Sequence, residues 1–98
     1  MNTAIMENWS VITNQNGFIP PELQRYMLQG NIYGDSRKIF PDGLPVSTGS
    51  IKDIKDFGTH KVVKTSRTEY KVSPDDVDPE YEKACPGAYG RLQRRGEI

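Results

Sequence analysis

Hydrophobic and polar residues alternate over several short segments of the chain, and a period of two is typical of β-strands. The clearest segments cover residues 9–13, 61–65 and 68–72, which are also rich in β-branched and aromatic side chains. Residues 31–33 and 44–51 carry shorter or interrupted versions of the same pattern. We therefore expect a small antiparallel sheet, or a partly open barrel, of about five strands.

Residues 20–28, which precede most of these strands in the chain, favour a helix. Residues 20–28 open with two prolines, which suit the first turn of a helix because its N–H groups have no intrahelical partner. Leu23, Tyr26 and Met27 follow at the spacing of one helical face. These features predict a short N-terminal helix over residues 20–28. Residues 51–57 are compatible with a helical turn or with a strand, and we favour the strand.

The chain changes character near residue 73, although 98 residues amount to one small domain. Residues 1–73 are expected to form a mainly β core that includes the short helix near residues 20–28. Residues 74–98 are rich in charge, with acidic residues first and arginines later, which is favourable along a helix. Pro86 and Gly87 interrupt this segment, which predicts a partly helical C-terminal extension with a broken helix. The expected fold class is α+β.

The composition narrows the class of partner. Thirteen basic and thirteen acidic residues give a formal net charge of zero, so a nucleic-acid or membrane-surface partner is not expected. Nine glycines and seven prolines leave a small core, which a homo-oligomer would stabilise. Cys85 is the only cysteine, and no segment has the pattern of a secretory signal or a membrane span. A cytoplasmic protein is the expectation.

No combination of residues in the sequence indicates catalysis. His60 is the only histidine and Cys85 is distant from it in sequence, so a zinc site has little support. The glycines that flank Tyr33 match neither a P-loop nor a dinucleotide-binding fingerprint. Asp53 and Asp56 alternate with lysines, which favours a solvated charged face over a cation site. We therefore expect a binding protein with no catalytic residues, no metal and no cofactor, and not an enzyme.

The strongest candidate for a binding site begins with residues 30–37, where glycines, one aromatic ring and one arginine occur together. Glycine allows backbone N–H groups to approach a phosphate, an arginine can bind it through two hydrogen bonds, and a tyrosine can stack on a base. Residues 47–50 and 65–68 add two hydroxyl clusters, although each segment alone is also ordinary turn chemistry. The expected ligand-binding residues are Tyr33, Arg37, Thr48, Ser50, Thr65, Arg67 and Tyr70.

The middle of the chain resembles a pattern of small proteins of phages and mobile elements in gut bacteria. The pattern places a Tyr-Gly pair before an arginine, an aromatic residue and Asp-Gly, and continues into a Thr/Ser cluster and a second hairpin. Its residues here are Gly30, Ile32, Tyr33, Gly34, Arg37, Phe40, Asp42, Gly43, Val46, Thr48, Ser50, Thr65, Glu69 and Tyr70. The resemblance implies a role against host defence, either by sequestering a signalling nucleotide or by masking a host protein.

Two functions follow from these observations. The first is non-enzymatic capture of a phosphate-containing small molecule, such as a cyclic nucleotide or another nucleotide-derived signal. Such a protein would act against host defence by sequestering the signal. The alternative is a protein-interaction module or inhibitor that masks a host protein through an edge strand or the C-terminal tail. The apolar candidates in that tail are Tyr81, Tyr89 and Leu92. A hydrolase that uses an aspartate and His60 is a third reading.

Overall fold

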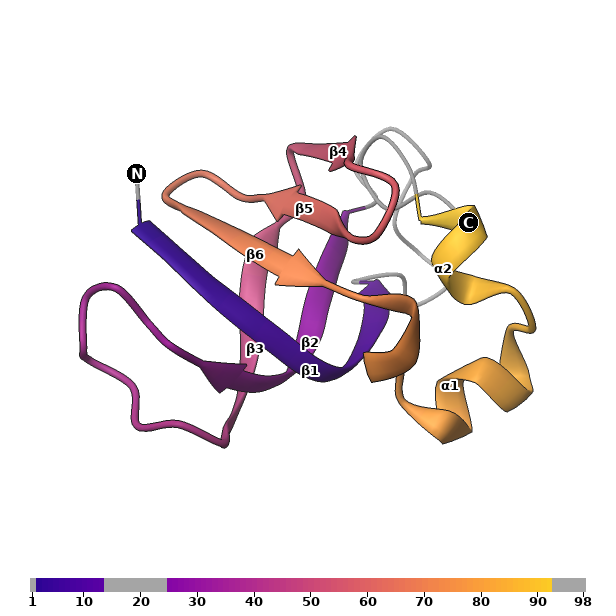
Figure 1. Cartoon of the computed structure of the whole chain (residues 1–98), viewed down its shortest axis with the longest axis horizontal. Coiled ribbons are helices and arrows are strands. Elements are labelled where there is room, and N and C mark those ends of the chain that lie inside the picture. Colours follow the sequence, from indigo (N-terminus) through magenta and orange to yellow (C-terminus); the bar gives the residue numbers. More distant parts are fainter. Residues whose placement is uncertain (1, 14–24, 93–98) are drawn as a thin grey trace.

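A computed structural model describes residues 2–13 and 25–92 of this chain. Its main feature is a six-stranded sheet with the strand order β3-β2-β1-β6-β5-β4 (Figure 1). The strands are β1 (Asn2–Thr13), β2 (Tyr26–Tyr33), β3 (Leu44–Ser50), β4 (Asp53–Asp56), β5 (Lys61–Lys64) and β6 (Thr68–Val72). Short helical segments follow them at η2 (Pro74–Asp76), α1 (Pro79–Ala84) and α2 (Ala88–Arg91).

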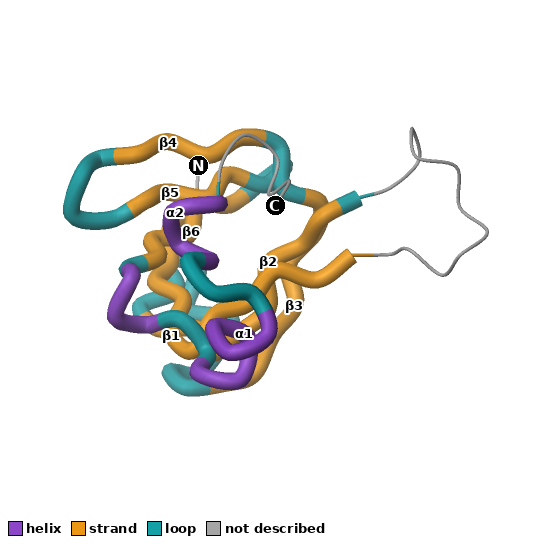
Figure 2. Tube along the Cα trace, turned by 90° about the vertical axis from the view of Figure 1, so that its right-hand side faces the viewer, coloured by secondary structure: helices purple, strands orange, loops and turns teal. Residues whose placement is uncertain are grey.

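Neighbouring strands are antiparallel except at the centre of the sheet, where β1 and β6 run parallel. The edge strands β3 and β4 are separated in the chain only by Ile51 and Lys52. The Ile51 N–H donates to the Tyr26 carbonyl in β2, and the Lys52 N–H donates to the Lys64 carbonyl in β5, both at 2.7 Å. The sheet is therefore rolled until its two edges come together at this point (Figure 2).

The structure confirms a small, sheet-rich domain with a few short helices, but the described residues form six strands where the sequence predicted about five. Residues 44–56 contribute two of these strands, because the chain passes from one edge of the sheet to the other within them. β1 is also longer than the strand predicted at residues 9–13, since it begins at Asn2. The predicted break in the C-terminal helix is confirmed, because α1 ends at Ala84 and α2 begins at Ala88.

The predicted helix over residues 20–28 is wrong in the part that the structure describes, because β2 begins at Tyr26. Residues 14–24, which include both prolines and Leu23, lie outside the described residues. From Leu28 onward alternate residues are buried, which is the pattern of a strand packed on one face. Pairing with β1 on one side and β3 on the other outweighs the helical spacing of Tyr26 and Met27.

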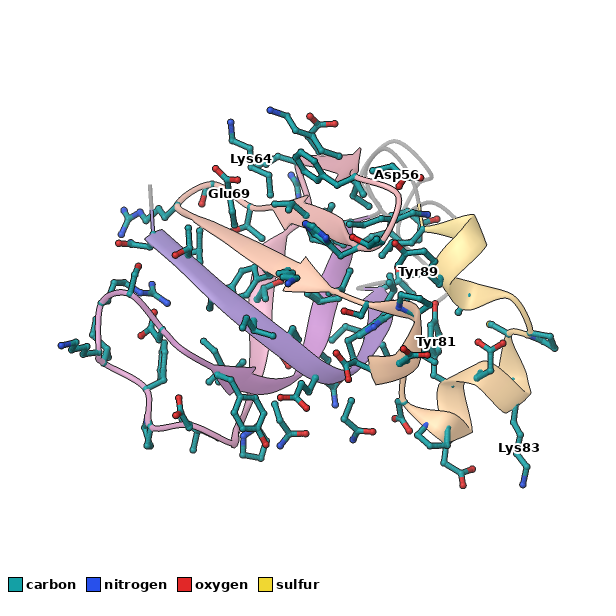
Figure 3. The ribbon with its side chains drawn as sticks, viewed as in Figure 1. Asp56, Lys64, Glu69, Tyr81, Lys83 and Tyr89 are labelled. Carbon is teal, nitrogen blue, oxygen red and sulfur yellow. The ribbon has the colours of Figure 1, made fainter. Side chains whose placement is uncertain are left out.

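Trp9 is fully buried and belongs to the core. Its indole N–H donates to the Ser73 carbonyl at 2.8 Å, and its ring lies edge-on to Tyr81, with 6.3 Å between the ring centroids. Leu92, which follows α2, is only 1% exposed and belongs to the same core cluster. The C-terminal segment therefore packs against the sheet, because Tyr81 and Tyr89 (both labelled in Figure 3) each contact the Trp9 ring.

Candidate functional site: a loop organised around Asp35

The loop between β2 and β3, residues 34–43, is organised around the carboxylate of Asp35, whose side chain is only 1% exposed. One carboxylate oxygen accepts from the Arg37 backbone N–H at 3.4 Å and from Arg37 Nε at 3.0 Å. The other accepts from the backbone N–H groups of Ile39 and Phe40, at 3.2 and 3.3 Å. A single buried carboxylate therefore bonds to the backbone N–H groups of three of the ten loop residues.

The hydrogen bonds keep Asp35 ionised. Burial is the largest single influence on the pKa of its carboxyl group, and burial alone would raise that pKa. The hydrogen bonds from the Arg37 side chain and from the backbone of Phe40, Arg37 and Ile39 together lower the pKa by more than burial raises it. The pKa of Asp35 consequently lies below its ordinary value of 3.8, and the carboxylate is charged at neutral pH.

The loop is also attached to the sheet and to itself. The Ser36 backbone N–H donates to the Thr3 carbonyl in β1 at 2.9 Å, and the Ser36 hydroxyl accepts from the Thr3 N–H at 2.9 Å. The Asp42 carboxylate accepts from the Gly34 N–H at 2.9 Å. Gly34 and Gly43 have positive φ angles of 60° and 87°, which glycine adopts without strain. These contacts attach the loop to β1 and join its two ends to each other.

The same loop holds two large apolar side chains in solvent. Ile39 is 65% exposed and Phe40 is 36% exposed, and we call this pair the apolar tip. The Arg37 guanidinium lies 5.4 Å from the centroid of the Phe40 ring, within the range of a cation–π interaction. The loop lies at the end of the molecule opposite α1 and α2 (Figure 1). A hollow of about 510 Å³ adjoins the apolar tip, and its lining includes Asp35, Lys38, Ile39, Phe40, Pro41 and Asp42.

The two arginines predicted to bind a ligand lie at the same end of the sheet. The Arg67 carbonyl accepts from the Asn2 N–H at 3.2 Å, in the turn between β5 and β6. Ser36, the neighbour of Arg37, bonds to Thr3. The backbone segments that carry Arg37 and Arg67 therefore flank the first residues of β1, although the Arg37 side chain is already engaged by the loop.

The predicted hydroxyl residues of β3 lie elsewhere. Ser50 pairs with Met27, so it is roughly 20 Å along an extended strand from the start of β3. The Thr48 hydroxyl accepts from the Leu28 N–H at 3.0 Å and donates to the Gly49 carbonyl at 2.8 Å. Thr48 therefore satisfies backbone groups of the sheet.

Thr65 and Tyr70 are both buried. The Thr65 hydroxyl donates to the Thr68 carbonyl at 3.1 Å, within the turn between β5 and β6. Tyr70 belongs to the core cluster and pairs with Ala4 of β1. Both side chains are thus used inside the fold.

Tyr33 is half-buried at the end of β2, next to the loop, where it pairs with Ile5 of β1. The structure therefore brings Tyr33, Arg37, Arg67 and the buried Thr65 to one end of the molecule, while Tyr70 lies in the core and Thr48 and Ser50 lie farther along β3. Capture of a phosphate ligand by the whole set stays a prediction.

The edge strands carry features that disfavour pairing with another chain. β4 is four residues long, and Asp53, Lys55 and Asp56 on it are exposed charged residues. β3 contains Pro45, which has no N–H to donate. Leu92 of the C-terminal tail is already packed in the core.

Sequence reasoning identified Arg37 but missed its relation to Asp35, Ile39 and Phe40. The signal was present: an aspartate precedes an arginine by two residues, and two consecutive apolar residues follow just before a Pro-Asp-Gly turn. Aspartate side chains commonly accept hydrogen bonds from backbone N–H groups a few residues ahead. The aspartate therefore predicts a loop whose backbone N–H groups bond to its side chain.

Within the described ranges, no group of three His, Cys, Asp or Glu side chains is arranged to hold a metal ion. No helix in the same part of the chain is long and apolar enough to cross a membrane. No protein-family model, no curated protein and no solved structure matches the chain in comparisons with known proteins.

Proposed function

We propose that this chain is a non-enzymatic binding domain that contacts another protein through its apolar tip. The supporting observation is the buried Asp35 carboxylate, which bonds to the backbone of both Ile39 and Phe40. A loop that only connected two strands would gain stability by burying these side chains, at roughly 25 cal/mol for each Å² of apolar surface. Holding them in solvent is a cost that binding to a partner would offset.

A loop that is held by its own hydrogen bonds is suited to binding. Ordering flexible side chains on association costs about 0.5–1.5 kcal/mol for each one, and a preformed loop avoids part of that cost. Arginine and large aromatic residues are enriched among the residues that dominate binding energy, although phenylalanine is less so than tryptophan or tyrosine. Arg37 and Phe40 lie together here, with the guanidinium over the ring.

The chemistry around the tip specifies the kind of partner surface. Lys38 is exposed beside the tip, and the Arg37 side chain is 24% exposed, whereas Asp35 is buried and the exposed Asp42 carboxylate accepts from the Gly34 N–H. An apolar pocket with carboxylates on its rim would complement this arrangement. We therefore expect a partner that receives Ile39 or Phe40 in an apolar pocket and faces Lys38 with acidic side chains.

A phage-displayed library of random peptides tests this proposal. Peptides enriched on the wild-type chain should combine apolar residues with Asp or Glu, and they should be lost on a double variant with Ile39→Ser and Phe40→Ser. Phe57→Ser is the matched control, because Phe57 is 58% exposed but lies in the turn between β4 and β5. Equal enrichment on the wild type and on the double variant would contradict the proposal.

Sedimentation velocity of the chain alone distinguishes another protein from a second copy of the same chain. The proposal predicts that the double variant has the same sedimentation coefficient as the wild type. A concentration-dependent oligomer that disappears in the double variant would instead show that the tip contacts a second copy.

A further inference from the structure

A polar groove crosses the outer face of the first three strands, and it does not include the apolar tip. It lies where the pairing of β1 with β2 shifts between Glu7 and Ser10, as at a β-bulge. Asn8, inside this shift, has a positive φ of 53°. Two hollows of about 390 and 290 Å³ both have Asn8 and Asn31 in their lining, so they adjoin each other, and we call them together the groove.

Polar side chains line the larger hollow, and all of them except the Asp78 carboxylate are neutral. Its amides and hydroxyls belong to Asn8, Ser10, Gln29, Asn31 and Ser47. The pairing register explains why they gather: Ser10 and Ser47 both lie opposite Gln29, from β1 and β3. Alternate residues of paired strands share a face, so these side chains stand on one surface of the sheet.

Most of these groups are not used by the fold. Among hydrogen bonds between described residues, none involves the side chain of Asn8, Ser10, Gln29 or Ser47. Asn31 donates its side-chain N–H to the Gly43 carbonyl at 3.0 Å, which fixes the amide and leaves its oxygen available as an acceptor. The groove therefore presents several donors and acceptors that no protein group within the described part of the chain satisfies.

The smaller hollow adds a ring and three carboxylates. Tyr33 lines it together with Glu7, Asp75 and Asp76. Negative charge there disfavours phosphate and other anions. The apolar side chains of the larger hollow are limited to Pro45 and Val46, which is too little for a mainly hydrophobic ligand.

We propose that this groove binds a neutral carbohydrate. Adjacent hydroxyl groups of a sugar act as both donors and acceptors, which planar amides and carboxylates match. The Tyr33 ring offers a flat apolar surface for the C–H face of a sugar ring, at the end of the groove where the carboxylates accept from hydroxyls. The combined volume of the two hollows is in the range of small-molecule sites. This site is separate from the proposed protein contact of the apolar tip.

Titration of the full chain with neutral trisaccharides of glucose, mannose and N-acetylglucosamine, followed by ¹H–¹⁵N NMR, tests the proposal. At least one trisaccharide should shift amide signals of Asn8, Gln29, Asn31 and Ser47, with millimolar affinity or better. Inorganic phosphate, as the comparison probe, should leave the same signals in place. No shift with any of the three sugars, or shifts spread over the whole spectrum, would overturn the proposal.

Two variants make the test specific. Gln29→Ala removes an exposed side chain that bonds to no described residue, so the fold should remain intact while sugar affinity falls about tenfold or more. Tyr33→Ala should weaken binding similarly, and Ile39→Ser should leave it unchanged. Unchanged affinity in folded Gln29→Ala and Tyr33→Ala would exclude this groove as the binding site, and with it the proposal.

Discussion

The Nζ atom of Lys61 lies 2.6 Å from the main-chain carbonyl oxygen of Tyr89, and this hydrogen bond ties β5 to the C-terminal helix α2. The same ammonium group donates to the Leu92 carbonyl at 2.8 Å and lies 4.5 Å from the centroid of the Tyr89 ring. A positive charge at the C-terminal end of a helix is favourable because carbonyl groups are unpaired there. Lys61 is therefore a buried lysine whose partners are backbone carbonyls and a ring.

Lys61→Met should destabilise the fold. Methionine has a similar length but no donor, so the Leu92 carbonyl oxygen loses the ammonium group and the Tyr89 carbonyl oxygen keeps only the Leu92 N–H. We expect the free energy of unfolding to fall by about 2 kcal/mol. Urea denaturation followed by the fluorescence of Trp9 measures this change. Lys64→Met is the control: Lys64 is in the same strand but pairs across from Glu69 (Figure 3), so its loss should change the free energy by only about 0.5 kcal/mol. Equal effects of the two substitutions would contradict the role given to Lys61.

Gly30→Ala should also be destabilising, because β1 and β2 approach closely at this position. A Cβ atom at residue 30 would lie 2.7 Å from the Glu7 carbonyl oxygen and 2.9 Å from Met6 Cγ. Relieving these contacts should cost about 1–3 kcal/mol in the free energy of unfolding. Gly49→Ala provides the comparison, because a Cβ there meets nothing within 4 Å. If the Gly30→Ala and Gly49→Ala proteins had the same free energy of unfolding, β1 and β2 would be able to move apart at residue 30 without loss of stability.

Hydrogen exchange at the Ile39 and Phe40 amides should report the charge of Asp35. The folded pKa lies below the ordinary value of 3.8, so the stabilising contribution of the carboxylate is complete above pH 3.8 and is lost as the pH falls through the folded pKa. Protection of both amides, corrected for intrinsic exchange, should be constant from neutral pH down to that range and then fall. Asp35→Asn should reduce the protection above that range and remove its dependence on pH. Protection that is equal in wild type and Asp35→Asn would show that the carboxylate does not hold the loop.

Leu92→Ala tests whether the C-terminal segment is part of the core. Leu92 is buried, and truncating a buried leucine costs about 2–5 kcal/mol. Leu44→Ala removes the same atoms from a side chain that is much more exposed, so it should cost less than about 1 kcal/mol. Chemical denaturation of both variants gives the comparison. Similar small losses in the two variants would mean that the C-terminal segment contributes little to stability.

The sequence predicted the β5–β6 hairpin well, because alternation over residues 61–65 and 68–72 is a local signal that the fold preserves. It failed at Tyr26 and Met27, where helical spacing was a local signal that pairing with strands far along the chain outweighed. The rolling of the sheet at Ile51 depends on hydrogen bonds to two strands at once, which no local pattern encodes.

At the candidate site too, local sequence patterns were informative and contacts made in the fold were not predictable. The residue types in 30–37 indicated binding chemistry, and Arg37 was among them, but residue type does not say which partner a side chain already has. Thr48 bonds to the sheet backbone and Arg37 bonds to Asp35, so both are engaged within the fold. The exposure of Ile39 could not be predicted from the sequence, because apolar residues are generally expected to be buried.

We propose that Asp35 holds the backbone of Ile39 and Phe40 in the conformation that binds a partner. Isothermal titration of one peptide selected on the wild-type chain should compare the wild type with Phe40→Ser, Asp35→Asn and Phe57→Ser. We predict that Phe40→Ser and Asp35→Asn each raise the dissociation constant by about tenfold or more, which is a loss of about 1.4 kcal/mol of binding free energy. Phe57→Ser should leave the dissociation constant unchanged. The same dissociation constant for all four proteins would contradict the claim.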